Sequence, residues 1–599
     1  MSFQRKTAFA CILLLLSDLV VYLYTQAPVV QFIDSGELAV VCKILGIAHP
    51  TGYPLYTLIG RLFTLLPAND VIFRVNLFSL LSVCLTNLIL FFIILKLAQK
   101  RSDLSIWTAF LTGLLFSFTP TLWDQATSNE VYGLNILFYS LIIFLVLTWR
   151  ERFRKRERSN ILYLLVFVCG LSFGNHMMIV LLLPAVAFIL LSYEKKAFLN
   201  HPKIISLIPF FILGISIYLY LPIRSAQNPL LDWGNPENWS AFARHVSGWQ
   251  YKVWMFSASF EHVFSNLDKF VKLFFKNFPP YLLLFTLLGM WRFITRDRRF
   301  FFFLLFIFFF VLIYAVNYSI PDLDPFFLGC FLVNVILVGN GLYLAFENLQ
   351  KLKLTKIISI GIILLFIILP LILLKKNYFE QDKNQSCFAY DLNSNILRSA
   401  RKDGLILTQL WGHYSPWLYL RYVELKRPDL AILSKDLCFY SWYTDYIKQN
   451  YPQIYKNSED LITEYGREAV LFEEGAKLDL KIIGIKYLDM LNGFLSRNLN
   501  MRPVYANLVG EQEIGNMLVK IPEGLVYSMK DTLAYYPYDF PNFQLRSVID
   551  QNVYRDERTR LFLLLYPILI GERIKYLEQF GMTIEADTLL EKYKSILRK

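Results

Sequence analysis

The sequence predicts a polytopic α-helical membrane protein with about eleven transmembrane helices and a C-terminal domain outside the membrane. Three observations support this prediction: the composition, the recurrence of long apolar runs and the placement of the basic residues. Hydrophobic residues make up 55% of the 599 residues, and the mean hydropathy is +0.42. A soluble protein of this length does not need so much apolar surface, so we expect most of the chain to lie in a bilayer.

The first apolar run, at about residues 8–26, follows the basic start MSFQRK, as in a secretory signal. The run is longer than the core of a signal peptide, and no small-x-small cleavage motif follows it. We therefore predict a retained first transmembrane helix. Further runs of spanning length occur at about residues 71–95, 104–119, 131–148, 203–221, 271–291, 299–316, 326–347 and 355–374.

Residues 160–193 are also apolar, but GLSFGNHMM interrupts them, so they form either one tilted helix or two short ones. With two short helices, all the basic clusters share the side of the N-terminus. With one helix, the last three clusters would face outward, against the positive-inside rule. Two helices are therefore favoured, which gives eleven spans. The clusters are KLAQKR, WRERFRKRER, YEKKAFLNHPK, RFITRDRR and LQKLKLTK.

The same distribution explains the net charge of +13 without nucleic acid as a partner, because the basic residues lie mainly in short loops between apolar runs. The bilayer is the expected partner. No P-loop or dinucleotide-binding fingerprint is found, and we expect no cofactor.

The chain is predicted to divide into a membrane domain, residues 1–376, and a soluble domain, residues 377–599. In the first part of the soluble domain, 377–541, NSNILRSARK and HYSPWLYLRYVELK favour helices, whereas DGLILTQ and PDLAILSK favour strands, which is typical of a βαβ unit. Residues 542–599 have helical periodicity. Cys387 and Cys438 could form a disulfide in an oxidising compartment or remain buried thiols.

The predicted topology places five groups of polar residues together on the side opposite the basic clusters. Ionisable groups at membrane depth are costly and usually functional. These loops carry DSGE with HPTGYP, TSNEVYG, GNH, the segment from LPIRS through WGNP to HVSGWQYK, and IPDLDPF.

In the first outer loop, Asp34 and Glu37 have the spacing of a helix N-cap and its capping-box partner. They could equally be catalytic carboxylates held at the mouth of a cavity. Further on, Pro50 and Pro54 favour extended backbone at His49 and Tyr53. These two side chains either stiffen a corner or point into a site. A metal is weakly supported, because no second histidine stands at ligand spacing.

The other candidates also allow a structural interpretation. Arg224 could anchor a helix end at the interface, or its guanidinium could hold a lipid phosphate in a bidentate way. Asp322 and Asp324 could solvate a turn or bind a divalent cation. Asn129, Glu130, Asn175 and His176 stand at helix mouths, where capping is the usual role.

Taken together, these motifs resemble one family closely. The motifs DSGE, AHPxGYPLY, WDQATSNEVYGLN, GLSFGNH, LYLPIRS with WGNP and HVSGWQY, and DLDPFF occur in that order over about residues 27–330. They are similar to the transmembrane O-mannosyltransferase family of the GT-C superfamily. The resemblance continues at RPDLAIL, Trp442–Tyr443, RPVYAN and EGLVYSM.

The resemblance implies a GT-C fold and an inverting transfer of a sugar, mannose in this family, from a polyprenyl-phosphate donor to a serine or threonine of an extracytoplasmic protein. It implies Asp34 as general base, with Glu37 beside it. Metal independence is our default expectation. Donor or phosphate binding is expected at Arg224, His49, His176 and Tyr53. The residues expected to line the site or meet the acceptor are Asn129, Glu130, Asn175, Trp233, Asn235, Asp322 and Asp324.

Two alternatives remain open at this point: a GT-C enzyme that modifies a lipid or cell-envelope glycan, and a transporter or flippase, for which inverted repeats would be expected. The composition and the absence of retention or transit signals favour a bacterial inner membrane, with the site on the periplasmic side. In a eukaryote the site would face the lumen of the endoplasmic reticulum.

Overall fold

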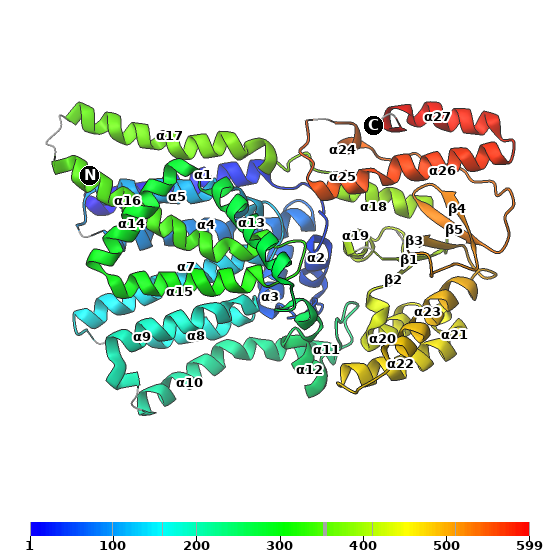
Figure 1. Cartoon of the computed structure of the whole chain (residues 1–599), viewed down its shortest axis with the longest axis horizontal. Coiled ribbons are helices and arrows are strands. Elements are labelled where there is room, and N and C mark those ends of the chain that lie inside the picture. Colours follow the sequence, from blue (N-terminus) through cyan, green and yellow to red (C-terminus); the bar gives the residue numbers. More distant parts are fainter. Residues whose placement is uncertain are drawn as a thin grey trace. The chain divides into compact units, whose positions relative to one another are not determined.

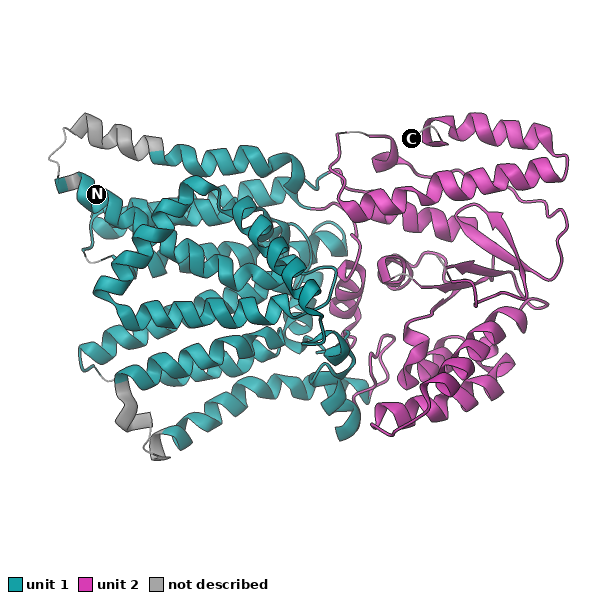
Figure 2. Cartoon of the chain, in the orientation of Figure 1, with its two compact units in different colours: residues 1–26, 49–226, 237–384 teal, residues 27–48, 227–236, 385–599 magenta. Residues whose placement is uncertain are grey.

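The computed structural model describes residues 2–98, 100–157, 160–198, 201–351, 356–409, 411–508, 511–550 and 552–597. The chain forms two compact units (Figure 2). Unit 1 comprises residues 1–26, 49–226 and 237–384, and unit 2 comprises residues 27–48, 227–236 and 385–599. The second unit therefore includes two short segments from the N-terminal half as well as the C-terminal region.

Unit 1 is entirely helical, and its long helices lie side by side (Figure 1). Its α-helices are α1 Phe3–Thr25, α3 Pro54–Thr64, α4 Val71–Leu97, α5 Asp103–Ser117, α6 Pro120–Ala126, α7 Tyr132–Arg154, α8 Ile161–Phe173, α9 Leu183–Phe198, α10 His201–Ile215, α11 Tyr220–Ser225, α12 Trp239–Val246, α13 Phe260–Asn277, α14 Pro280–Arg296, α15 Arg298–Val316, α16 Leu328–Lys351 and α17 Lys356–Gln381. Short 3₁₀ helices are η1 Met177–Leu182, η2 Ser216–Leu219, η3 Trp249–Trp254 and η4 Asp324–Phe327.

Among the described residues, six helices are long and apolar enough to cross a membrane, and the number is eight if each of two bent pairs counts as one span. The described structure therefore supports six to eight spans where the sequence predicted about eleven. The predicted runs 104–119 and 271–291 belong to the bent pairs, which turn by 75° before α6 and by 96° before α14. A proline starts the second helix of each pair, where its fixed φ is tolerated. Residues 160–193 form two shorter apolar helices, as predicted. Much of the predicted span 355–374 lies outside the residues whose side chains are described.

Contacts inside unit 1 join the predicted basic clusters. Lys6 pairs with Asp103 at 2.5 Å, Lys96 with Glu151 at 2.9 Å, and Arg296 with Glu347 at 3.7 Å. The WRERFRKRER segment also reaches two other clusters, because Arg150 pairs with Asp297 and Arg154 donates to the Tyr193 hydroxyl at 2.7 Å. The described residues near the N-terminus and in or beside the five clusters thus gather at one end of the helices. In this arrangement the chain between Arg154 and Tyr193 must cross the membrane an even number of times, which agrees with the prediction of two short helices there.

Unit 2 contains a five-stranded mixed sheet in the order β2-β1-β3-β5-β4. Its strands are β1 Leu405–Thr408, β2 Ala431–Ser434, β3 Val504–Asn507, β4 Val519–Glu523 and β5 Val526–Lys530. Strands β2 and β3 pair with β1 in parallel, and β5 pairs antiparallel with both β3 and β4. The predicted βαβ unit is confirmed as β1, helix α19 and β2, with Leu405 opposite Ala431 and Thr408 opposite Ser434.

The helices of unit 2 are α2 Ser35–Ile44, α18 Phe388–Ser399, α19 Trp411–Tyr422, α20 Ser441–Asn450, α21 Pro452–Asn457, α22 Glu459–Glu473, α23 Leu480–Ser496, α24 Arg546–Ile549, α25 Glu557–Leu563, α26 Leu565–Gln579 and α27 Thr583–Leu597, with the 3₁₀ helix η5 Leu437–Phe439. The segment after residue 542 is helical, as its periodicity predicted. Cys387 and Cys438 are buried free thiols.

Candidate active site

Asp34 and Glu37 stand at the start of α2, in unit 2. Asp34 is the N-cap residue by position, but its side chain makes no capping hydrogen bond, and its backbone is helical, with φ −81° and ψ −10°. The capping interpretation of Asp34 is therefore not supported. Glu37 is fully buried in the first turn of α2. Two carboxylates are thus placed by a helix rather than by a flexible loop.

The carboxylate of Asp34 is held by a side chain 377 residues away in the sequence. The indole Nε1–H of Trp411, the first residue of α19, donates to Asp34 Oδ1 at 2.7 Å. One turn further along α19, Ser415 Oγ accepts from the backbone N–H of Glu37 at 3.0 Å. A Cβ on Gly36 would lie 2.1 Å from the Ser415 carbonyl oxygen, so only glycine allows α2 and α19 to approach this closely.

A second segment of unit 2 joins these helices. Ile47 donates to the Leu231 carbonyl at 2.8 Å and accepts from Trp233 N–H at 3.4 Å, which forms a short parallel bridge. Trp233 is thereby placed against Trp411, with ring centroids 5.4 Å apart and planes at 83°, and against Trp442 at 5.2 Å. Trp233 thus lies between Trp442 and Trp411, and Trp411 is the tryptophan that contacts Asp34. Asn235 lies in the same loop with a left-handed backbone, φ 40°.

In unit 1, a second cluster is built around His49 and Tyr53. The Tyr53 hydroxyl lies 3.0 Å from His49 Nε2 and 3.3 Å from the Pro50 carbonyl. The Tyr53 ring stacks on His176 with centroids 5.9 Å apart and planes at 12°. His176 also contacts Tyr132 at 5.4 Å. These donor-site candidates from residues 49–53 and from the GNH turn thus lie together.

The backbone at Tyr53 differs from the extended geometry predicted from Pro54. Tyr53 has φ 42° and ψ 49°, in the left-handed region, and it follows Gly52 with φ +89°. The prediction was wrong because α3 begins at Pro54, and the chain must reverse sharply to enter it. A non-glycine residue in this region costs on the order of 1–3 kcal/mol, and such residues concentrate at functional sites.

His176 occupies the turn between α8 and η1. Burial, together with the neighbouring His49, lowers the pKa of His176 to about 3, so its imidazole is neutral. Its Nδ1 accepts from the Met178 backbone N–H at 3.1 Å. The proton of the neutral ring is therefore on Nε2, and His176 can donate a hydrogen bond there but carries no charge.

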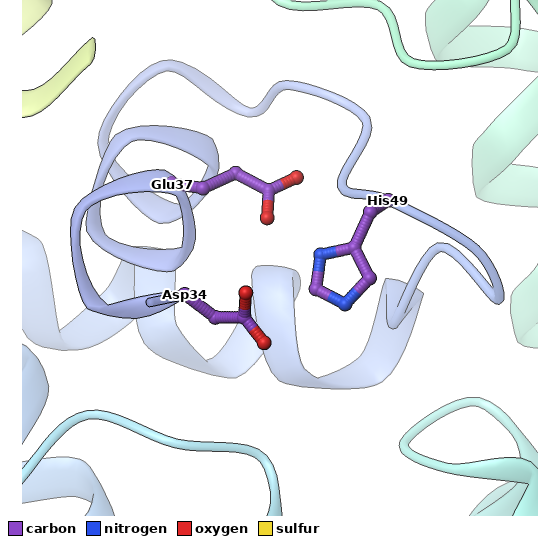
Figure 3. Close-up of side chains that lie close together, drawn as sticks. All are labelled: Asp34, Glu37 and His49. Atoms are coloured by element: carbon purple, nitrogen blue, oxygen red, sulfur yellow. The ribbon is translucent and has the colours of Figure 1, made fainter. Parts of the chain in front are cut away.

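Asp34, Glu37 and His49 come from one short stretch of chain and point toward one another (Figure 3). Each offers one ligand atom, and these atoms lie within 4.8 Å of one another. Glu37 and His49 are buried, whereas Asp34 is half-buried. A carboxylate–carboxylate–imidazole set of this size can share protons or hold a small divalent cation.

The other candidates in unit 1 have structural contacts. Asn175 Nδ2 donates to the Val131 carbonyl at 3.1 Å and ties the GNH turn to the start of α7. Glu130 N–H donates to Ser79 Oγ at 3.4 Å. Asn129 is fully buried and precedes this contact. The structure thus brings the TSNEVYG and GNH motifs together. The Asn175 side chain contributes through its hydrogen bond to the Val131 backbone, and Glu130 through its own backbone N–H.

Arg224 is half-buried in α11, at the end of a candidate span. Asp324 begins η4 and pairs with Lys269 of α13 at 2.9 Å. This pair is largely exposed and ties the DLDP turn to α13. Asp322 is two residues earlier in the same turn.

Within unit 2, the structure brings Asp34, Glu37 and Trp233 together. Within unit 1, it brings together His49, Tyr53 and His176. Trp411 and Ser415 were missed by sequence reasoning. The aromatic-rich WGHYSPW that begins α19 is the sequence signal that could have drawn attention to them, but nothing in it indicates a partner so far away in the chain.

Residues 34–199 match the family model described as the protein O-mannosyl-transferase TMEM260 N-terminal domain. Among curated proteins, the chain is 25% identical to protein O-mannosyl-transferase tmem260 of Dictyostelium discoideum, over 99% of this chain and 75% of that protein. It is 28% identical to mouse TMEM260, over 70% of this chain and 62% of the mouse protein, so less than two thirds of the mouse protein is covered.

Among solved structures, ArnT from Cupriavidus metallidurans bound to undecaprenyl phosphate superposes with a TM-score of 0.47 and 12% identity, over 71% of this chain and 89% of ArnT. Its apo state gives a TM-score of 0.46. The family model begins at Asp34, and the alignment to the slime-mould protein covers nearly the whole chain. Over residues 34–199, and in the longer alignments, the chain is similar to protein O-mannosyl-transferases of the TMEM260 family.

Proposed function

We propose that this chain is an inverting, membrane-embedded mannosyltransferase with a GT-C fold of about eleven spans. It takes mannose from a polyprenyl phosphate and transfers it to a serine or threonine hydroxyl of a protein. The site and the domain 377–599 lie on the extracytoplasmic side. The relatives come from eukaryotes, for which that side is the lumen of the endoplasmic reticulum, whereas composition favoured a bacterial inner membrane.

The acceptor hydroxyl gives up its proton to Asp34 while its oxygen attacks the anomeric carbon. The bond from that carbon to the phosphate oxygen breaks on the opposite face, so the configuration inverts. The observation that supports this role most directly is the Asp34 carboxylate itself. It does not cap its own helix, and it is held from outside by Trp411. A general base has to be fixed in place within reach of the hydroxyl that it deprotonates.

The leaving phosphate gains negative charge as the bond breaks. Arg224 holds it through the guanidinium, which presents two parallel N–H donors to a phosphate. A fixed donor aimed at developing charge contributes about 3–4 kcal/mol to transition-state stabilisation. His176 can help only as a neutral donor through Nε2, because its imidazole is uncharged. Tyr53 fixes the orientation of His49.

The chemical class of the acceptor distinguishes this function from the alternative, in which the enzyme modifies a lipid or a glycan. Membranes containing the chain, supplied with labelled polyprenyl-phosphate mannose, are expected to incorporate label into protein. Incorporation into lipid or glycan alone would assign the alternative.

The role of Asp34 is tested by Asp34→Asn in the same assay. Mannose transfer is expected to fall at least about 100-fold, because the amide cannot accept the proton, while the variant inserts and folds normally. Asp460→Asn is a matched control, since Asp460 pairs with Arg497 on the surface of α22, and transfer should stay within twofold. Normal turnover by Asp34→Asn would remove the proposed mechanism.

The same carboxylates could instead bind a cation, because the ligand atoms of Asp34, Glu37 and His49 lie as close together as those of a metal site. We propose metal independence, since Trp411 already donates to Asp34 and the Tyr53 hydroxyl already contacts His49. Treatment with a chelator in the assay above should leave transfer unchanged. A loss that Mn²⁺ or Mg²⁺ restores would assign the three groups to a cation.

A further inference from the structure

We propose that Trp411 is a positioning residue for the catalytic carboxylate, so that the C-terminal region completes the active site. This inference deepens the function proposed above and rests on the role of Asp34 as base. An indole Nε1–H can only donate, and a carboxylate only accepts, so their contact at 2.7 Å has one possible direction. A donor on Oδ1 restricts the rotation that exchanges the two carboxylate oxygens, so the same oxygen faces the acceptor at each turnover.

The indole is itself held on both sides. Trp233 packs edge-on against it at 5.4 Å, and Tyr414 packs at 5.9 Å with planes at 35°. The Tyr414 hydroxyl lies 3.0 Å from the Tyr443 hydroxyl, which in turn accepts from the Ser434 backbone N–H at 3.1 Å. The orientation of Trp411 is thereby coupled to the end of β2, in the rigid part of the sheet.

The two helices that carry the pair are also fixed to each other. Gly36 lies against the backbone of Ser415, and the Ser415 hydroxyl binds the backbone of Glu37. Before α2, Phe32 packs against Phe388 at 5.9 Å and Phe562 at 4.9 Å. The separation of Asp34 and Trp411 is therefore set by packed helices at both ends of the contact, as a precise catalytic geometry requires.

The topology explains why this part of the sheet is suited to the task. Strand β1 lies between β2 and β3; the connection after β1 leads to β2 on one side of the sheet, whereas the connection after β3 leads to β4 on the other side. Parallel sheets bind ligands at the carboxyl ends of strands at such a reversal of order. Trp411 follows the carboxyl end of β1 by three residues. Here the position is used to hold the proposed catalytic carboxylate of the protein itself.

The test is Trp411→Phe in the full-length protein, with polyprenyl-phosphate mannose and an acceptor protein as substrates. The variant retains an aromatic ring but loses the donor. Since a hydrogen bond to a charged group is removed, kcat is expected to fall about 10- to 100-fold, while KM for the donor stays within about twofold. Trp442→Phe is the matched control, because Trp442 belongs to the same aromatic cluster, and its kcat should stay near that of the unchanged protein.

Two further measurements separate the possible outcomes. In the Asp34→Asn background, Trp411→Phe should cause no further loss of the residual rate, because the positioned carboxylate is already absent. If Trp411→Phe fails to fold, replacement of Trp411 by β-(3-benzothienyl)alanine removes only the N–H and keeps the ring size. An unchanged kcat in either folded variant, with Asp34→Asn inactive, would overturn this inference alone. Full activity of Asp34→Asn would overturn the proposed function as well.

Discussion

His413 lies two residues after Trp411 on α19 and is fully buried between the rings of Trp417 and Phe562. Its Nδ1 lies 2.9 Å from Asn393 Oδ1. The Asn393 amide nitrogen donates to the Ala389 carbonyl, so Oδ1 must accept and the His413 proton is on Nδ1. Burial lowers the pKa of His413 from 6.5 to about 3, which keeps the imidazole neutral in the folded protein.

This burial predicts a pH dependence of stability. Below pH 6.5 His413 is protonated in the unfolded chain, whereas in the folded chain it is protonated only below about pH 3. The unfolded state therefore binds more protons, and the free energy of unfolding decreases as the pH falls through this window, by up to about 1.4 kcal/mol per pH unit. His413→Gln keeps a side-chain donor without the titration, and its stability should fall less steeply between pH 6.5 and 4.

Thermal unfolding of the full-length protein in detergent, followed at several pH values, measures this difference. His262→Gln is the control, because His262 is exposed on α13, and the pH dependence should be that of the unchanged protein. Parallel curves for His413→Gln and the unchanged protein would mean that His413 does not contribute to acid sensitivity.

At the scale of elements, the contact between α2 and α19 depends on one glycine. Gly36→Ala would place a methyl group 2.1 Å from a backbone oxygen, which cannot move away as a flexible side chain could. Overpacking of this kind costs about 1–3 kcal/mol. Because the displaced helix carries Asp34, we expect transfer activity to fall at least about tenfold together with the melting temperature.

Gly466→Ala is the matched substitution, since Gly466 also lies inside a helix of unit 2, α22, and a Cβ there would have no neighbour within 4 Å. It should leave activity unchanged and be neutral or stabilising by up to about 1 kcal/mol. Equal effects of the two substitutions, measured by thermal unfolding and by transfer, would show that the close approach at Gly36 is unimportant.

Local sequence patterns predicted only those elements of unit 2 whose pattern is complete within a short, continuous segment. The strand–helix–strand unit around α19 could be recognised, because alternation and helical spacing are properties of short segments. Strands β3 to β5 were not predicted, because each has only four or five residues. Strand β3 lies in the RPVYAN stretch, and β5 overlaps the EGLVYSM stretch. The bent pairs at α6 and α14 were counted as ordinary spans, because hydropathy shows the length of an apolar run but not a bend within it.

The candidate site shows the same limit. Asp34, Glu37 and His49 are near one another in the sequence, so their proximity could be predicted. The spacing of Asp34 and Glu37 also favoured a capping box, which the structure does not contain. The hydrogen bond from Trp411 to Asp34 joins segments 377 residues apart and arises only through tertiary packing. No local pattern could indicate it.

At the scale of the whole molecule, the distribution of charge predicts which side of the membrane each part faces. Ion pairs and hydrogen bonds gather the described residues near the N-terminus and in or beside the five basic clusters at one end of unit 1. Loops rich in lysine and arginine remain in the cytoplasm. The residues proposed for catalysis alternate with these clusters along the chain, so we predict that they lie on the opposite side of the membrane.

This sidedness is tested by labelling single introduced cysteines with a membrane-impermeant maleimide in sealed vesicles of known orientation. Arg156→Cys, in the exposed WRERFRKRER segment, is expected to react only from the cytoplasmic side. Glu464→Cys, exposed on α22, is expected to react only from the other side. The unchanged protein gives the background, since six of its seven cysteines are buried and Cys11 lies within α1. Labelling of both positions from one side would contradict the topology and, with it, access of Asp34 to an extracytoplasmic acceptor.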